Sequence, residues 1–165
     1  MGDEVEAAKA KRLRFNGSEI VEAIVDSKNR CDLFRRLFDF FPTLSKEERQ
    51  FPLAYAMLVH KDLVQVLMLL SAVYQPQNQF CVAVDGKADQ KFWMAINELS
   101  NCYPNIAVVR AQRVEWCSFE IIEANIRLHS LLANSTVDWK YVQSKDSPLP
   151  LVKKLAIGSI LQRIC

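Results

Sequence analysis

The chain has 165 residues, of which 50% are hydrophobic and 24% charged, and its net charge is +2. This length and composition predict one globular domain with a buried core, and the small net charge argues against a nucleic-acid or membrane-surface ligand held by charge. The longest apolar stretch, residues 63–73, is too short to span a membrane, and residues 1–15 lack the apolar centre of a signal peptide.

Cysteine and histidine usage disfavours a metal or redox site. The five cysteines include no C-x-x-C pair, and the two histidines, His60 and His129, are far apart in the sequence. We therefore expect no bound metal ion and no cofactor. Taken alone, the cysteine pattern favours buried, unreactive thiols.

Residues 1–50 are predicted to form a helical lead-in that packs on the sheet as an accessory layer. Ser18 is a suitable N-cap for a first helix. Ser45 and Glu48 form a capping-box pattern just before the first strand. Between them lies an apolar stripe at helical spacing, which is more often core than a ligand pocket. The stripe consists of Leu33, Phe34, Leu37, Phe38 and Phe41.

Residues 51–87 read as one strand–helix–strand unit. Residues 51–59 and 79–84 are apolar runs of strand length, and residues 63–73 are apolar nearly all round. The turn at 74–78 contains Pro76 and Asn78, both favoured in turns. Because a helix joins the two strands, we expect them to be parallel with a right-handed crossover.

The rest of the chain continues the alternation of helices and strands. We predict a helix over 88–99, a strand over 106–109, a helix over 119–132, a strand over 139–143 and a final helix over 151–165. In the helix over 119–132, the apolar side is expected to carry Phe119, Ile122, Ile126 and His129. This order predicts an α/β fold with a mostly parallel sheet flanked by helices, with a Rossmann-like region at 51–150.

Polar residues follow the first two strands where a ligand of such a sheet would bind. His60, Lys61 and Asp62 follow the first strand, and Asp85, Gly86 and Lys87 follow the second. Each has an ordinary structural alternative: His60 ends a strand, Asp62 is better explained as a helix cap, Gly86 permits a tight turn, and Asp85 and Lys87 suit a plain turn. His129 is better explained as a core or boundary residue. Nucleophile-elbow and phosphate-loop motifs are absent.

Five separated motifs together carry a family resemblance. They are FPLAYAMLVH at 51–60, AVYQPQN at 72–78, FCVAVDGK at 80–87, NCYPN at 101–105 and WKY at 139–141. In order and spacing they resemble the core-2/I-branching β-1,6-N-acetylglucosaminyltransferases, over about residues 16–149. The resemblance covers the N-terminal part of that family's domain.

The resemblance implies a Golgi-lumenal, membrane-anchored enzyme with a nucleotide-sugar-binding fold of GT-A type. Such enzymes transfer N-acetylglucosamine from UDP-N-acetylglucosamine to O-glycans or related acceptors, by an inverting, metal-independent displacement with a glutamate base. Carried over by motif, Val59, His60, Asp85 and Lys87 would form the donor-nucleotide site. The acceptor and the linkage stay open. The donor sugar stays open too, because relatives in this fold family also use xylose.

The sequence also departs from the family pattern. Ala83 stands where the family has His, the Tyr-Ala-Ser-Trp motif is displaced to 116–119, and the segment at 144–149 is shortened. The glutamate base and the diphosphate-binding basic residues have no counterpart here, so we expect the 165 residues alone to be inactive. The first alternative is a non-enzymatic remnant that self-associates or binds a partner through uncovered apolar surface. A cytosolic nucleotide binder unrelated to glycans is a weaker one.

The resemblance changes the interpretation of the cysteines. Cys31 and Cys102 match two family half-cystines that pair with each other, so we expect a disulfide between them. Cys81 matches another half-cystine, whose partner position aligns with Leu128. A lumenal location would also give weight to two glycosylation triplets, which begin at Asn16 and Asn134.

Overall fold

The computed structural model describes residues 17–38, 40, 45–115, 118–144 and 152–153. Its helices are α2 (Gly17–Asp26), α3 (Arg30–Phe38), α4 (Lys46–Gln50), α5 (Leu63–Val73), α6 (Gln90–Cys102) and α7 (Phe119–Ala133). Its strands are β1 (Leu53–Val59), β2 (Gln79–Val84), β3 (Ile106–Arg110), β4 (Tyr141–Ser144) and β5 (Val152–Lys153). Predictions at Asn16, Phe41, 116–117 and 145–149 lie outside the described residues.

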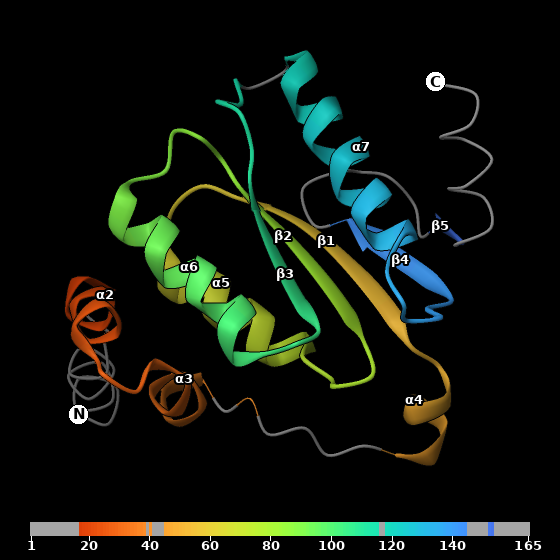
Figure 1. Ribbon diagram of the computed structural model, residues 1–165, viewed down its shortest axis with the longest axis horizontal. Helices are drawn as coiled ribbons and strands as arrows, with labels where there is room; N and C mark the ends of the chain where they lie inside the picture. Colours follow the sequence, from red (N-terminus) through yellow and green to blue (C-terminus); the bar gives the residue numbers. More distant parts are fainter. Residues whose placement is uncertain (1–16, 39, 41–44, 116–117, 145–151, 154–165) are drawn as a thin grey trace, which may run out of the picture.

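The strands form one sheet in the order β3-β2-β1-β4-β5 (Figure 1). The first four are parallel, which confirms the predicted α/β fold, and β5 pairs with β4 in the antiparallel direction. The register places Val59 opposite Val84, and Val84 opposite Arg110. These three residues end their strands, so three polypeptide connections leave the sheet on the same side. We call this side, formed by the carboxyl ends of the strands, the carboxyl edge.

The main core lies between the sheet and helices α5 and α6. The side chains of Met57 and Val59 from β1 and of Phe80, Val82 and Val84 from β2 are all buried there. The alternation follows from the two-residue period of a strand, which sends every second side chain to the same face. Both helices cover this face because the chain moves in one direction from β1 to β2 to β3.

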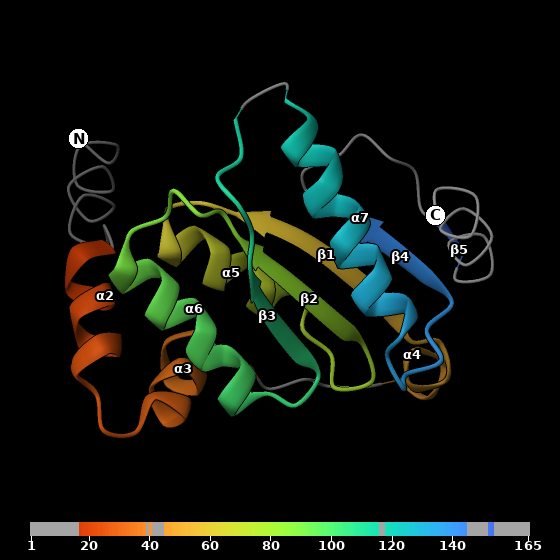
Figure 2. The ribbon, with the colours of Figure 1, turned by 45° about the horizontal axis from the view of Figure 1, so that its top comes forward.

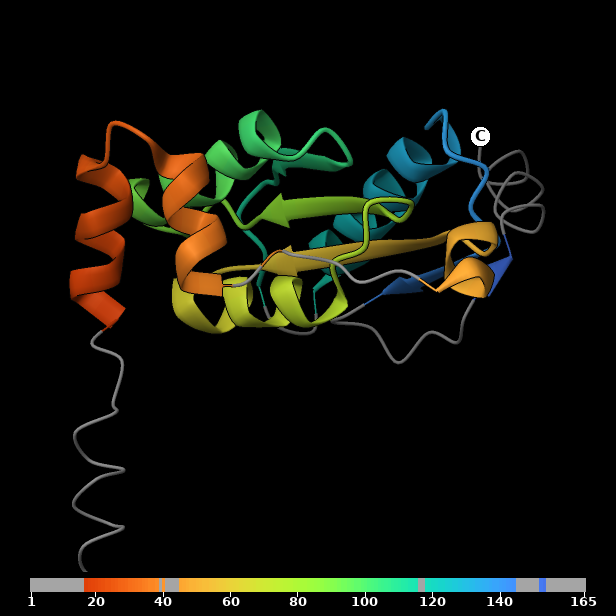
Figure 3. The ribbon, with the colours of Figure 1, turned by 90° about the horizontal axis from the view of Figure 1, so that it is seen from below.

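Helices α2 and α3 form a further layer at one end of the molecule, beside α5 and α6 and away from α7 and β4 (Figures 1 and 3). They bury Ile20, Ile24, Phe34 and Phe38 in the same cluster as the helices beneath them. This layer therefore packs mainly on α5 and α6, whereas the sequence led us to expect that it would pack on the strands.

The second face of the sheet is lined by small side chains and covered by α7. Ala54, Ala56, Cys81 and Ala83 are all buried in this second cluster. Small side chains leave room for large ones from the helix and the next segment, and Leu128, Leu132 and Trp139 fill it. The indole Nε1 of Trp139 donates a hydrogen bond to the Leu132 carbonyl at 3.0 Å, so this buried donor is satisfied.

The predicted apolar side of α7 is wrong at Phe119 and Ile122, whereas Ile126 and His129 are half-buried. Phe119 is 70% exposed and Ile122 is 54% exposed, while the buried side chains include Leu128 and Leu132. The sheet beneath α7 accepts the turns around Leu128 and Leu132, and the side chains of Phe119 and Ile122 lie on the opposite side of the helix. The helix therefore leaves an apolar patch on the outside of the protein.

The predicted helix over 151–165 is also wrong at its start. Val152–Lys153 forms β5, paired with Tyr141 and Val142 of β4. An edge strand presents unpaired backbone donors and acceptors, and a returning segment can satisfy them. Residues 154–165 lie outside the described part of the chain.

Candidate functional site

The carboxyl ends of β1, β2 and β3 are joined by backbone hydrogen bonds. Asp85 N donates to Val59 O at 2.8 Å, which connects the end of β2 to the end of β1. Ala111 N donates to Val84 O at 2.8 Å and connects the residue after β3 to β2. In open α/β sheets ligands bind beyond this end of the strands. The edge at the arrowheads of β1 and β2 in Figure 2 is therefore the candidate site.

A cleft of about 460 Å³ lies between the end of β1 and the start of α5. Its lining includes Val59, His60, Lys61, Gln65 and Leu69. Val59 is buried, whereas His60, Lys61 and Gln65 are exposed. The cleft thus combines an apolar wall with a few polar groups at its rim, which is the usual character of a small-molecule site.

Asp62 follows the cleft residues His60 and Lys61 and precedes α5. It adopts a left-handed backbone conformation with φ of 60°, and its side chain accepts a hydrogen bond from Gln65 N at 3.2 Å. The prediction that Asp62 caps the helix is therefore confirmed. A residue other than glycine in this conformation carries backbone strain, and such residues gather at functional sites. Here the strained residue separates the two polar groups His60 and Gln65.

Asp85 is buried, with 5% of its surface exposed. Its Oδ1 accepts hydrogen bonds from Lys87 N at 2.8 Å and from Val114 N at 3.2 Å. The first bond closes the turn after β2, and the second ties that turn to the segment after β3. Buried carboxylates are stable when backbone donors satisfy them in this way. This oxygen therefore organises the edge from inside.

Gly86 is required by a close approach of two backbones. Its φ is not positive, so the left-handed conformation that favours glycine does not explain it. A Cβ at this position would lie 3.0 Å from both Arg113 N and the carbonyl carbon of Gln112. The segment after β3 therefore crosses directly over the turn after β2. The tight turn predicted at Gly86 is present, since Ala88 N donates to Asp85 O at 2.9 Å, but its backbone conformation does not require glycine.

Lys87 and Glu115 face each other across these two segments. Lys87 Nζ lies 3.4 Å from Glu115 Oε1, and the two side chains are 25% and 69% exposed. Arg113 on the same segment is also exposed, and the Arg110 guanidinium lies 5.4 Å from the centre of the Trp93 ring. Basic side chains therefore lie beside the carboxylates of Asp85 and Glu115 at this edge, and the basic ones suit an anionic ligand.

The structure brings the four predicted site residues to one edge but not into one cavity. Val59 and His60 line the cleft, whereas Asp85 and Lys87 lie at the end of the neighbouring strand and do not line it. The sequence analysis placed Lys61 where a ligand would bind but overlooked Gln65 and Leu69 as lining residues. Their spacing of four residues on α5 is a signal that could have identified them.

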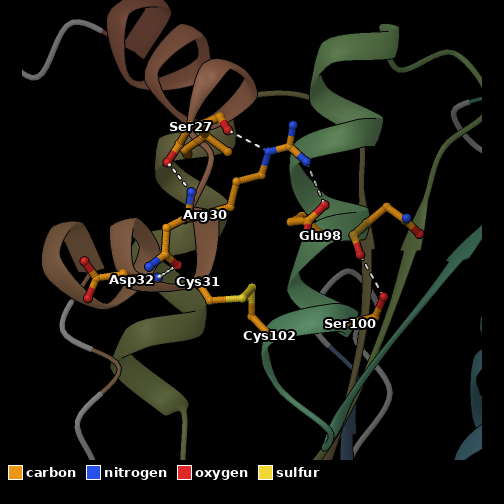
Figure 4. Close-up of a disulfide and its surroundings, with 10 residues drawn as sticks. Ser27, Arg30, Cys31, Asp32, Glu98, Ser100 and Cys102 are labelled. Atoms are coloured by element: carbon orange, nitrogen blue, oxygen red, sulfur yellow. Dashed lines mark hydrogen bonds and ion pairs between the residues drawn. A yellow bond between two sulfur atoms is a disulfide. The ribbon is translucent and has the colours of Figure 1, made fainter.

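A disulfide joins Cys31 of α3 to Cys102 of α6, across 71 residues of sequence (Figure 4). Beside it, Arg30 donates to the carbonyls of Ile24 and Val25 at 3.0 and 2.9 Å. The same guanidinium pairs with Glu98 Oε2 at 3.0 Å. Together these contacts bind the N-terminal layer to α6 near its C-terminal end, away from the candidate site.

Three other residues considered in the sequence analysis, Asn134, His129 and Cys81, lie outside the candidate site. Asn134 is exposed at the C-terminal end of α7. His129 lies 3.0 Å from Ser144 Oγ through its Nε2, and burial lowers the pKa of its imidazole. Burial raises the pKa of the Cys81 thiol to about 12, so this cysteine is protonated and unreactive at neutral pH. Leu128 lies in the same apolar cluster as Cys81.

The described residues contain neither a candidate metal site nor a membrane-spanning helix. Over these ranges, no group of three or more histidine, cysteine, aspartate or glutamate side chains is placed to hold a metal ion. Of the helices that the structure describes, none is long and apolar enough to cross a membrane.

The sequence matches known proteins over most of its length. A model of the Core-2/I-Branching enzyme family matches residues 53–163. A probable β-1,3-galactosyl-O-glycosyl-glycoprotein β-1,6-N-acetylglucosaminyltransferase 7 from Sus scrofa is 37% identical over 128 residues, which cover 77% of this chain and 30% of the relative. The type 3 enzyme from Homo sapiens is 37% identical over 136 residues, covering 81% of this chain and 30% of the relative.

A third relative also matches most of this chain but only about a third of its own length. The type 4 β-1,6-N-acetylglucosaminyltransferase from Mus musculus is 32% identical over 144 residues, or 86% of this chain and 31% of the mouse enzyme. The chain therefore spans about a third of the length of the curated relatives it matches. The matched region includes the whole parallel sheet and the candidate edge. The protein belongs to the core-2/I-branching enzyme family.

Proposed function

We propose that the carboxyl edge of β1 and β2 binds the nucleotide part of UDP-N-acetylglucosamine. The base and ribose would occupy the cleft lined by Val59 and His60, and the diphosphate would extend toward Lys87. The observation that carries this proposal is the cleft at the end of β1, with the ammonium group of Lys87 at the end of the neighbouring strand. Family membership supports the donor, because the named relatives are N-acetylglucosaminyltransferases.

Asp85 has a different role in this proposal from a plain ribose ligand. Its Oδ1 is already used by the backbone of Lys87 and Val114. We propose that Asp85 positions the edge and that any contact with the ribose uses its other oxygen.

Calorimetric titration of the purified chain with UDP tests the proposal. We expect a dissociation constant below the millimolar range, and weaker binding by Lys61→Ala because Lys61 lines the cleft. Lys46→Ala is a matched control, since Lys46 is an exposed lysine in α4 near the opposite end of β1. Absence of binding at millimolar UDP, or equal effects of the two variants, would count against the cleft.

We further propose that the protein works in the Golgi lumen and that these 165 residues alone transfer no sugar. The resemblance gives the catalytic glutamate no counterpart among them. An assay with UDP-N-acetylglucosamine and a core-1 O-glycan acceptor checks this. Transfer by the purified chain would contradict it.

A second candidate function is self-association through the outer side of α7. Phe119 and Ile122 are 70% and 54% exposed on adjacent turns, and exposed apolar patches often contact another protein. Sedimentation velocity should then show a dimer that the double substitution Phe119→Ser with Ile122→Ser dissociates. Met68→Ser removes an equally exposed apolar side chain from α5 and should leave the dimer intact. A wild-type monomer at all concentrations would contradict this function.

A further inference from the structure

Lys87 is anchored at its backbone, and most of its side chain is covered. Its backbone nitrogen donates to the buried Oδ1 of Asp85 at 2.8 Å. Its side chain is only 25% exposed, and its ammonium group lies 3.4 Å from Glu115 Oε1. The ammonium group of Lys87 therefore lies at the carboxyl edge, where the carboxylate of Glu115 pairs with it.

Glu115 is fixed only at its backbone. The preceding residue, Val114, donates its N–H to Asp85 Oδ1 at 3.2 Å. The hydroxyl of Ser118 donates to the Glu115 carbonyl at 2.6 Å. The carboxylate beyond this anchored backbone is 69% exposed. The side chain can therefore turn into solvent without disturbing the segment that carries it.

A ligand can displace the Glu115 carboxylate from this ion pair more easily than it can displace Lys87. An exposed carboxylate that pairs with an ammonium gains little over water, and salt screens the gain. A diphosphate carries more charge and more acceptor oxygens than one carboxylate, so it competes well for the same ammonium. Glu115 therefore leaves Lys87 easily, while the backbone of Lys87 stays bonded to Asp85 and its largely covered side chain stays at the edge.

We propose that Glu115 is an internal counter-ion that occupies Lys87 in the ligand-free protein and that a nucleotide phosphate displaces. The inference rests on the proposed function, because it names the residue that sets the phosphate affinity of the same edge. Glu115 is thereby a specificity-determining residue. It admits ligands that carry enough negative charge to replace it, and it contributes nothing to binding of the nucleoside.

The test compares UDP with uridine by calorimetry at low ionic strength. Glu115→Gln should tighten UDP binding about two- to fivefold, and should leave uridine binding unchanged. Glu47→Gln makes the same change in net charge in α4, near the opposite end of β1, and should alter neither affinity. Added salt should reduce the gain from Glu115→Gln.

A double-variant cycle assigns the effect to the pair. Lys87→Met keeps most of the side-chain packing but removes the charge, and in that background Glu115→Gln should no longer change UDP affinity. If the wild type binds UDP and Glu115→Gln binds no tighter, the inference is overturned while the proposed function stands. An equal gain in the Lys87→Met background also overturns it. If neither the wild type nor Glu115→Gln binds UDP, the inference and the proposed function both fail. Binding by Glu115→Gln alone supports the inference.

Discussion

Gly86 and Asp85 bring two segments together at the edge of the sheet in different ways. Gly86 lets the backbone of Gln112 and Arg113 cross at van der Waals distance, because it has no side chain. Asp85 then bonds one oxygen to donors from both segments. Two residues therefore hold the candidate site together: Gly86 allows the close approach of the two segments, and the buried carboxylate of Asp85 bonds to both.

Replacement of Gly86 by alanine should destabilise the protein by about 1–3 kcal/mol, because the new Cβ meets backbone atoms that cannot turn away. Urea unfolding measures this loss, and UDP affinity should fall with it because the edge is displaced. Gly17→Ala is the matched control: its Cβ would lie 3.8 Å from a Val64 methyl group, an ordinary contact. Equal stability of the two variants would refute the role assigned to Gly86.

At the element scale, the disulfide and Arg30 attach the N-terminal layer to α6. Cys102 ends α6, and α6 runs from the carboxyl edge of the sheet to the opposite edge. The covalent link therefore stabilises the scaffold at a distance from the candidate site. Its contribution should appear in the free energy of unfolding rather than in ligand affinity.

Substitution of both Cys31 and Cys102 by serine should lower the free energy of unfolding by about 2–4 kcal/mol, because the unfolded chain loses a cross-link that closes a long loop. UDP affinity should remain unchanged at temperatures where the variant is folded. Reductant should destabilise the wild type by a similar amount and leave the variant unaffected. A variant as stable as the oxidised wild type would show that the cross-link has no such effect.

Local patterns predicted the elements but not how each one faces its neighbours. Apolar runs bounded by turn residues located β1, α5 and β2, and the capping-box pattern of Ser45 and Glu48 is present as predicted. The buried side of α7 depends on the small side chains of a sheet distant in sequence. The pairing of Lys87 with Glu115 likewise depends on the crossing of two segments, and no local pattern encodes that crossing.

At the scale of the whole molecule, the two edges of the sheet have separate tasks. One edge carries the cleft, the strained Asp62 and the ion pair of Lys87 with Glu115. The opposite edge carries α4 and a polar network in which Asn105 donates to the carbonyls of Gln75 and Asn78. The first arrangement suits an anionic ligand, whereas the second ties the strand ends together.

Chemical-shift mapping of the 15N-labelled chain during a UDP titration shows whether a uridine nucleotide binds at the carboxyl edge. We predict that the largest shifts fall on residues 59–61, 85–87 and 113–115, while amides of α4 stay unchanged. Shifts centred on α4 or on the outer side of α7, or none at millimolar UDP, would show that the nucleotide does not bind at this edge.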